Sequence, residues 1–94
     1  MRMDVPPDHY PVSALRNLGP RSAVMLAEAG IRTIGELREI GAARAYARVR
    51  ENHRRGASGN LLWSIAAGLD GRKWQEVPAE EKASLLAEVR RLRR

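Results

Sequence analysis

Gly19, Arg21 and Ser22 are the residues whose types and spacing could bind an anion. They lie in the segment SALRNLGPRSAVMLAEAG, in which a glycine and a proline are followed at once by a helical pattern. The first N–H groups of a helix have no partner inside it, and the helix dipole makes that end positive. Such an end can hold a phosphate, to which Arg21 would add charge and Ser22 a hydroxyl donor.

The same segment also has a purely structural interpretation. Gly19 permits a tight turn and Pro20 suits the first position of a helix, so the pair is an efficient connection between two helices. Hairpins that bind nucleic acid usually carry two glycines around an apolar residue, and here Asn17 stands in place of the first. Phosphate binding and a plain helix–helix turn are therefore both open from the sequence.

Further arginines could contact phosphates or an acidic partner. Arg44, Arg48 and Arg55 recur at helical spacing, but Glu51 shares their face, which also fits a solvated helix surface. The chain has 17 Lys and Arg residues against 11 Asp and Glu residues, a formal net charge of +6. Such a balance is compatible with nucleic acid, with an acidic protein, or with a basic soluble surface.

Enzyme chemistry finds little support in the 94 residues. Cysteine is absent, the two histidines are isolated, and neither a phosphate-binding P-loop nor a Ser–His–Asp arrangement can be proposed. We therefore expect no enzyme, no cofactor and no metal. No apolar run approaches the ~18 residues of a membrane helix, and the N-terminus lacks the apolar core of a signal peptide. A cytoplasmic protein without membrane contact is the expectation.

The elements that position these residues are predicted to be helices throughout. The pattern indicates an all-α fold, a compact bundle of five to six short helices with a helix-hairpin-helix-like N-terminal half. Residues 1–12 are rich in proline and predict an extended, weakly ordered arm, and residues 13–94 a single helical domain. Ser13 is expected to cap a first helix over residues 14–17.

Later signals set the remaining boundaries and the core. Gly30 is expected to end the second helix at a positive φ, and Thr33-x-x-Glu36 is the pattern of a capping box that opens the third. The segment 61–69 is apolar on most sides and is expected to be central. Apolar stripes predict that these side chains are buried: Leu26, Leu37, Tyr46, Leu62, Trp63, Ile65 and Leu86.

Several short segments together carry a resemblance to a known family. They are LRNLGPRS at 15–22, AGI at 29–31, LREIGA at 37–42 and NLLW at 60–63, followed by Gly71, Trp74, Pro78 and Lys82. The chain resembles the C-terminal domain of the TfoX/Sxy competence regulators. The resemblance implies a helical, non-catalytic domain involved in regulating DNA uptake and natural transformation. Fuller members have a further N-terminal domain, so a free-standing copy of the C-terminal domain is expected.

Two function classes follow. The first is a non-catalytic regulatory module that binds the nucleic-acid backbone through the hairpin, without sequence specificity. The second is a protein-interaction module that docks a transcription regulator or a polymerase subunit. The basic charge favours the first class, and the single glycine of the hairpin favours the second.

Overall fold

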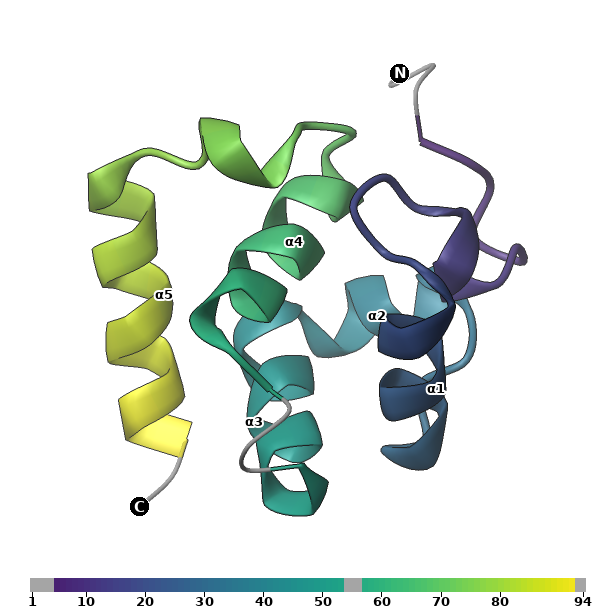
Figure 1. The fold of residues 1–94 in the computed structure, drawn as a ribbon, viewed down its shortest axis with the longest axis horizontal. Coiled ribbons are helices and arrows are strands. Elements are labelled where there is room, and N and C mark those ends of the chain that lie inside the picture. The colour runs from purple at the N-terminus through teal and green to yellow at the C-terminus, as the bar shows by residue number, and fades with distance from the viewer. Residues whose placement is uncertain (1–4, 54–56, 93–94) are drawn as a thin grey trace.

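Helices form every regular element in residues 5–53 and 57–92, which are the residues that this computed structural model describes (Figure 1). The elements in chain order are η1 (Val12–Ala14), α1 (Pro20–Glu28), α2 (Ile34–Ile40), α3 (Ala42–Asn52), α4 (Gly59–Leu69), η2 (Trp74–Glu76) and α5 (Ala79–Leu92), where η denotes a 3-10 turn. Strand-like pairing within these residues is limited to an isolated bridge between Pro11 and Thr33. The predicted all-α fold is confirmed.

The helix α4 lies at the centre of the molecule, between α5 on one side and α1 and α2 on the other (Figure 1). Its sequence GNLLWSIAAGL is apolar around most of the circumference, as a helix with neighbours on several sides requires. Leu62, Ile65 and Ala67 are completely buried. The helix α3 packs against α4 and also contacts α1, α2 and α5, so these two helices connect all the others.

The predicted core is confirmed at all positions but one. The buried side chains include Leu26, Leu37, Tyr46, Leu62, Trp63 and Ile65. The prediction for Leu86 is wrong, since this residue is 38% exposed. In α5 the core side is formed by Val89 together with the partly buried Leu85 and Leu92. Leu86 lies about 100° around the helix from Leu85, which places it beyond the edge of that face.

The predicted first helix over residues 14–17 is also wrong. The chain forms a 3-10 turn at Val12–Ala14 instead, and Leu15 leaves the helical region with ψ 146°. A long-range backbone bond explains the earlier start, because the Val12 amide donates to the Arg32 carbonyl at 3.1 Å. Val12, Leu15 and Leu18 all become buried. The segment before α1 is therefore shaped by its tertiary contacts rather than by helix propensity.

The described part of the N-terminal arm is attached to the start of α2. The Ile34 amide donates to the Tyr10 carbonyl at 3.0 Å, and the Gly35 amide donates to the Asp8 carbonyl at 2.9 Å. A Cβ atom added at Gly35 would lie 3.1 Å from Cβ of Asp8, so the two segments approach closely. Backbone hydrogen bonds thus join Asp8, Tyr10 and Val12 to the domain, while residues 7–11 remain exposed to solvent.

Two predicted helix boundaries are confirmed by their geometry. Gly30, just beyond α1, has φ 86°. Thr33 caps α2 with a complete capping box, in which its hydroxyl accepts from the Glu36 amide and the Glu36 carboxylate accepts from the Thr33 amide. These two features fix the direction of the chain between α1 and α2.

Candidate functional site

The N-terminus of α1 is exposed and has no side-chain cap. Gly19 occupies the N-cap position in an extended conformation, and Pro20 follows at the first helical position. The Ala23 amide donates to the Gly19 carbonyl, but no described residue accepts a hydrogen bond from the amides of Arg21 and Ser22. The Arg21 side chain is exposed and Ser22 is half-buried. The helix therefore presents two unpaired donors beside a cation at its positive end.

Asn17 holds the turn that leads into α1. It is the one non-glycine residue with a positive φ, 76°, in the part of the chain that the structure describes. Its Nδ2 donates to the Arg72 carbonyl at 2.9 Å, and its Oδ1 accepts from the Trp74 amide at 3.3 Å. Asparagine tolerates the left-handed region better than most residues. Asn17 thus supplies the conformation that a first glycine would provide and adds an anchor that glycine lacks.

The turn also lies directly against α4. A Cβ atom at Gly68 would come within 2.6 Å of the Arg16 carbonyl oxygen, a distance that real Cβ atoms do not adopt. The absence of a side chain at Gly68 therefore permits the close contact. Together with the Asn17 bonds, this contact orients the start of α1 relative to α4.

A pocket of about 310 Å³ lies between the first turns of α1 and α4. We call it the hairpin pocket. Its lining residues are Arg21, Ser22 and Met25 from α1, Ser58 at the N-cap of α4, and Asn60, Leu61 and Ser64 from α4. The α1 members include two of the predicted site residues. The α4 members were not predicted, because local patterns do not show which helix packs beside α1.

The start of α4 resembles that of α1 in its free donors. Ser58 makes no side-chain cap bond, and the Leu61 amide donates to the Ser58 carbonyl at 3.1 Å. Within the described residues no acceptor pairs with the amides of Gly59 and Asn60. The serine–glycine–asparagine run in the polar segment 52–60 was the only sequence signal for this half of the pocket.

The remaining predicted arginines lie elsewhere or outside the described residues. Arg44 and Arg48 are exposed on α3, on the side that also carries Glu51, and they do not line the hairpin pocket. Arg55 falls among residues 54–56 and lies outside the described part of the chain. The structure thus brings Arg21 and Ser22 together beside Gly19, and leaves Arg44 and Arg48 on a separate face.

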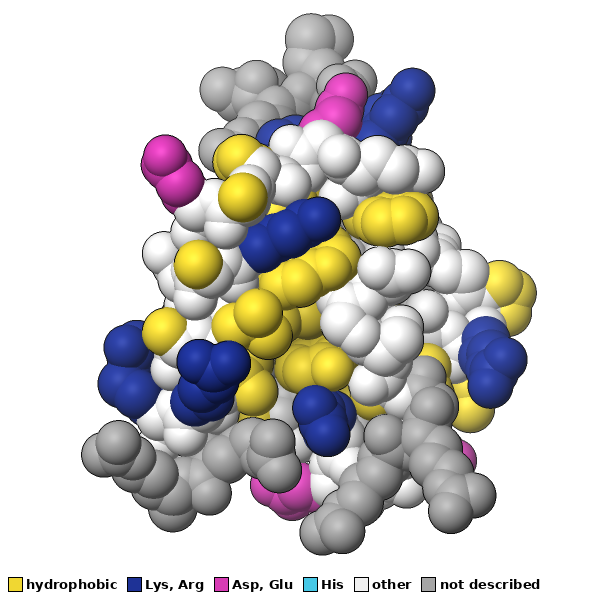
Figure 2. Space-filling model, turned by 60° about the vertical axis from the view of Figure 1, so that its left-hand side comes forward, with side chains coloured by type: hydrophobic (Ala, Val, Ile, Leu, Met, Phe, Trp, Pro, Cys, Tyr) yellow, Lys and Arg dark blue, Asp and Glu magenta, His cyan; other side chains and the backbone are white. Residues whose placement is uncertain are grey.

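Two cationic side chains lie beside aromatic rings of the core, Tyr46 and Trp63. The Lys82 ammonium lies 5.4 Å from the centre of the Trp63 ring, and the Arg50 guanidinium lies 5.9 Å from that of Tyr46. Figure 2 shows, on one face of the molecule, hydrophobic side chains exposed in a hollow with Lys and Arg side chains across it. Sequence reasoning missed the Lys82–Trp63 contact, because it joins segments that are distant along the chain.

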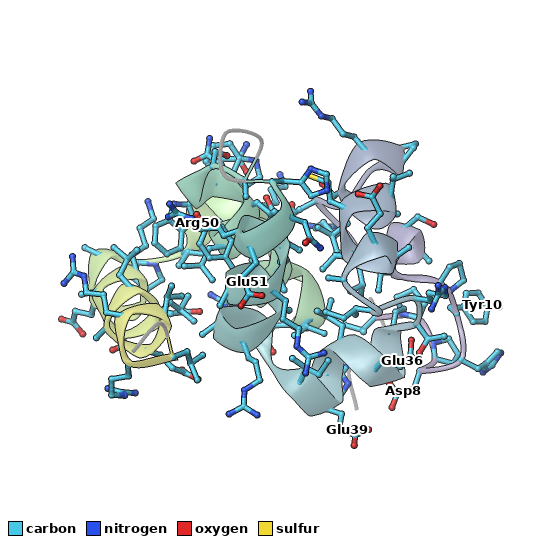
Figure 3. All side chains as sticks on the ribbon, turned by 90° about the horizontal axis from the view of Figure 1, so that it is seen from below. Asp8, Tyr10, Glu36, Glu39, Arg50 and Glu51 are labelled. Atoms are coloured by element: carbon cyan, nitrogen blue, oxygen red, sulfur yellow. The ribbon has the colours of Figure 1, made fainter. Side chains whose placement is uncertain are left out.

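Acidic side chains gather around α2. Asp8, Glu36 and Glu39 lie on the same side of the molecule in Figure 3. Hydrogen bonds from the backbone amides of Arg32 and Thr33 lower the pKa of the Glu36 carboxyl, which keeps it charged. Asp8 pairs with Arg38 at 3.3 Å. Carboxylates thus outnumber the neighbouring exposed arginines, Arg32 and Arg38, on this side.

Two further kinds of feature are absent from the described residues. They contain no group of three or more His, Cys, Asp or Glu side chains that could hold a metal ion. None of their helices is long and apolar enough to cross a membrane. His53 pairs with Glu28 in an exposed contact.

The described residues form a small all-helical domain, and comparison with known proteins identifies its family. The model of the TfoX C-terminal domain matches residues 9–89, and the chain belongs to this family. The crystal structure of an uncharacterized protein from Listeria monocytogenes is similar, with a TM-score of 0.77 and 26% identity. That match covers 88% of this chain and 93% of the other. No curated protein matches the sequence.

Proposed function

We propose that this domain is a non-catalytic regulatory module of the cytoplasm that binds the nucleic-acid backbone through the N-terminus of α1. Family membership suggests a role related to competence and DNA transformation. The observation that carries the proposal is the uncapped helix end, where the amides of Arg21 and Ser22 are unpaired within the described residues and the Arg21 side chain is exposed. The net charge of +6 favours approach to a polyanion.

Binding of this kind reads charge and not sequence. Backbone amides and an arginine at a helix end contact phosphate oxygens, which are the same in every nucleotide. The affinity expected for such non-specific contacts is roughly 10⁻⁴–10⁻⁶ M at physiological salt. In a regulatory complex, this domain would supply non-specific affinity for DNA. A second protein would supply the sequence specificity.

Fluorescence anisotropy with labelled DNA duplexes of unrelated sequence tests the proposal. We expect Arg21→Glu to weaken binding to the same extent on all duplexes, because a phosphate contact carries no base information. Arg44→Glu makes the same charge change on an exposed face of α3 and is the matched control. A larger loss with Arg44→Glu would move the binding surface to α3. Absence of binding at low salt would overturn the proposal.

The alternative is a protein-interaction module that docks a transcription regulator or polymerase subunit. The hydrophobic side chains exposed in a hollow in Figure 2, with Lys and Arg side chains beside them, favour it. Such a surface would suit an acidic partner with apolar anchors. Titration of a purified subunit against the fluorescence of Trp63 and Trp74 would report docking there, and an unchanged emission would contradict it.

A further inference from the structure

We propose that the hairpin pocket is a site for one phosphate group, held jointly by the first turns of α1 and α4 and by the hydroxyl of Ser64. This inference deepens the proposed function, on which it rests for a nucleic-acid backbone as the source of the phosphate. It adds the α4 half of the site, which neither the sequence pattern nor the family match assigns. The same chemistry would also accept a free phosphate, and parallel titrations with phosphate and with DNA separate the two sources.

Ser64 is the observation that points to a ligand. It lines the hairpin pocket, yet only 9% of its surface is exposed. A serine inside a helix commonly returns its hydroxyl to the carbonyl four residues earlier. No such bond is present here, and no described residue pairs with the Ser64 hydroxyl, although the Ser64 carbonyl accepts from Asn17.

The hydrogen-bonding of the other polar side chains indicates that the Ser64 hydroxyl is accessible from outside the core. In the described residues, no side-chain polar atom that is sealed from solvent lacks a hydrogen-bond partner. Since the Ser64 hydroxyl has no partner among them, it must reach open space. Ser64 lines the hairpin pocket, and we infer that its hydroxyl is available to a ligand there.

The other lining groups favour an anion. Two helices of nine and eleven residues begin at the pocket, and each begins without a side-chain cap. Their amides without a described partner belong to Arg21 and Ser22 in α1 and to Gly59 and Asn60 in α4. The positive ends of both helix dipoles therefore border the same space.

The side chains that line the hairpin pocket also favour an anion. Among the described residues, Arg21 is the only charged side chain that lines the pocket, and no carboxylate lines it. Hydroxyl and amide groups of Ser22, Ser58 and Asn60 supply further donors. Met25 and Leu61 add an apolar wall, which limits water on one side. A cation finds no anionic ligand in this set, whereas a tetrahedral oxyanion finds donors from both helices.

Amide NMR spectra of the full chain test the inference directly. Inorganic phosphate is titrated against a sodium chloride series of equal ionic strength. We expect saturable shifts of the amides of Ser22, Asn60 and Ser64 with phosphate and not with chloride. In Ser64→Ala the phosphate affinity should fall about tenfold, because a hydrogen bond to a charged group is lost.

The matched control is Ser84→Ala, which removes a hydroxyl from an exposed position of α5. It should leave the phosphate affinity unchanged. Thermal unfolding without phosphate separates binding from folding. Ser64→Ala removes no hydrogen bond that the described residues make, so its unfolding midpoint should equal or exceed that of the wild type. Phosphate should raise the wild-type midpoint more than that of the variant.

A short DNA duplex in the same experiment distinguishes the two proposals. Pocket shifts with both phosphate and DNA, both weakened by Ser64→Ala, support a backbone phosphate in the pocket. Pocket shifts with phosphate but no binding of DNA keep the phosphate site and overturn the proposed function. DNA binding that is insensitive to Ser64→Ala, with no pocket shifts from phosphate, overturns this inference alone. If phosphate causes no pocket shifts and DNA does not bind, both proposals are overturned.

Discussion

Asn17 combines the backbone conformation of a glycine with side-chain hydrogen bonds that a glycine cannot make. Its φ of 76° gives the turn the conformation that glycine ordinarily supplies. Its side chain then joins the turn to the segment after α4, through Arg72 and Trp74. Asn17 thus supplies a positive φ at the position where the sequence pattern of a nucleic-acid-binding turn would have a glycine.

Replacement of Asn17 should separate these two contributions. Asn17→Ala should destabilise the domain by about 2–3 kcal/mol, from left-handed strain and lost hydrogen bonds. Asn17→Gly removes the bonds but relieves the strain, so it should cost less than Asn17→Ala. Urea unfolding of the three proteins measures the difference. Equal stability of the two variants would contradict a conformational role for Asn17.

Gly30 tests backbone conformation without packing. Its φ is 86°, and a Cβ atom added there would meet no heavy atom within 4 Å. Gly30→Val should therefore destabilise by at least ~1 kcal/mol, purely because a β-branched residue resists this region.

Gly19 provides the matched control for this change. It also has open space around its Cβ position, but its φ is −95°. Gly19→Val should cost less than Gly30→Val, since a φ of −95° lies in the region that valine ordinarily adopts. An equal loss at Gly19 and Gly30 would contradict a cost determined by φ.

At the scale of elements, helix ends were more predictable than the segments between them. Gly30 and the capping box at Thr33 are local signals, since the residues that make the bonds lie within four positions of one another. The turn η1 is different, because the Arg32 carbonyl that receives the Val12 amide is distant along the chain. A pattern confined to neighbouring residues cannot contain that contact.

The same distinction explains the candidate site. Gly19, Arg21 and Ser22 were found because they belong to one helix start. Ser58, Asn60 and Ser64 lie beside them only because α1 packs near α4, which no local spacing reveals. Half of the hairpin pocket was therefore accessible to sequence reasoning, and the other half required the tertiary arrangement.

The capping box predicts a pH dependence at the start of α2. Backbone hydrogen bonds lower the pKa of Glu36 in the folded protein, so its charged form stabilises the fold above the unfolded pKa of about 4.3. That contribution is lost as the pH falls through the lower, folded pKa. Glu36→Gln should be less stable than the wild type near neutral pH, and the two should converge in acid.

Urea unfolding from neutral pH to below the folded pKa measures this convergence. Glu39→Gln is the control, because Glu39 is an exposed carboxylate on the same helix for which no capping bond is present. A difference between Glu36→Gln and the wild type that persists unchanged in acid would contradict a lowered pKa of Glu36 in the folded protein. Salt should affect the capping box weakly, because its bonds are short and direct.

On the scale of the whole molecule, charge is unevenly distributed. The carboxylates of Asp8, Glu36 and Glu39 gather around α2, whereas Arg21 stands at the hairpin pocket. Arg21 is the one charged side chain among the described residues that line the pocket, so a DNA strand docked there contacts only part of the net charge of +6. A polyanion approaching the molecule should be oriented by this asymmetry before any contact forms.

The salt dependence of DNA binding should reveal how many phosphates the protein neutralises. A strand docked at the hairpin pocket would have about two to four phosphates neutralised, which predicts a log–log slope of affinity against salt of about −2 to −4. If all six net charges acted together, the slope would be about −5. Anisotropy at several salt concentrations measures it, and Arg21→Glu should make the slope less steep by about one unit. A steeper slope that Arg21→Glu leaves unchanged would mean that the strand contacts the basic surface as a whole. A contact between Arg21 and a phosphate releases counterions, so loss of that contact would have to make the slope less steep.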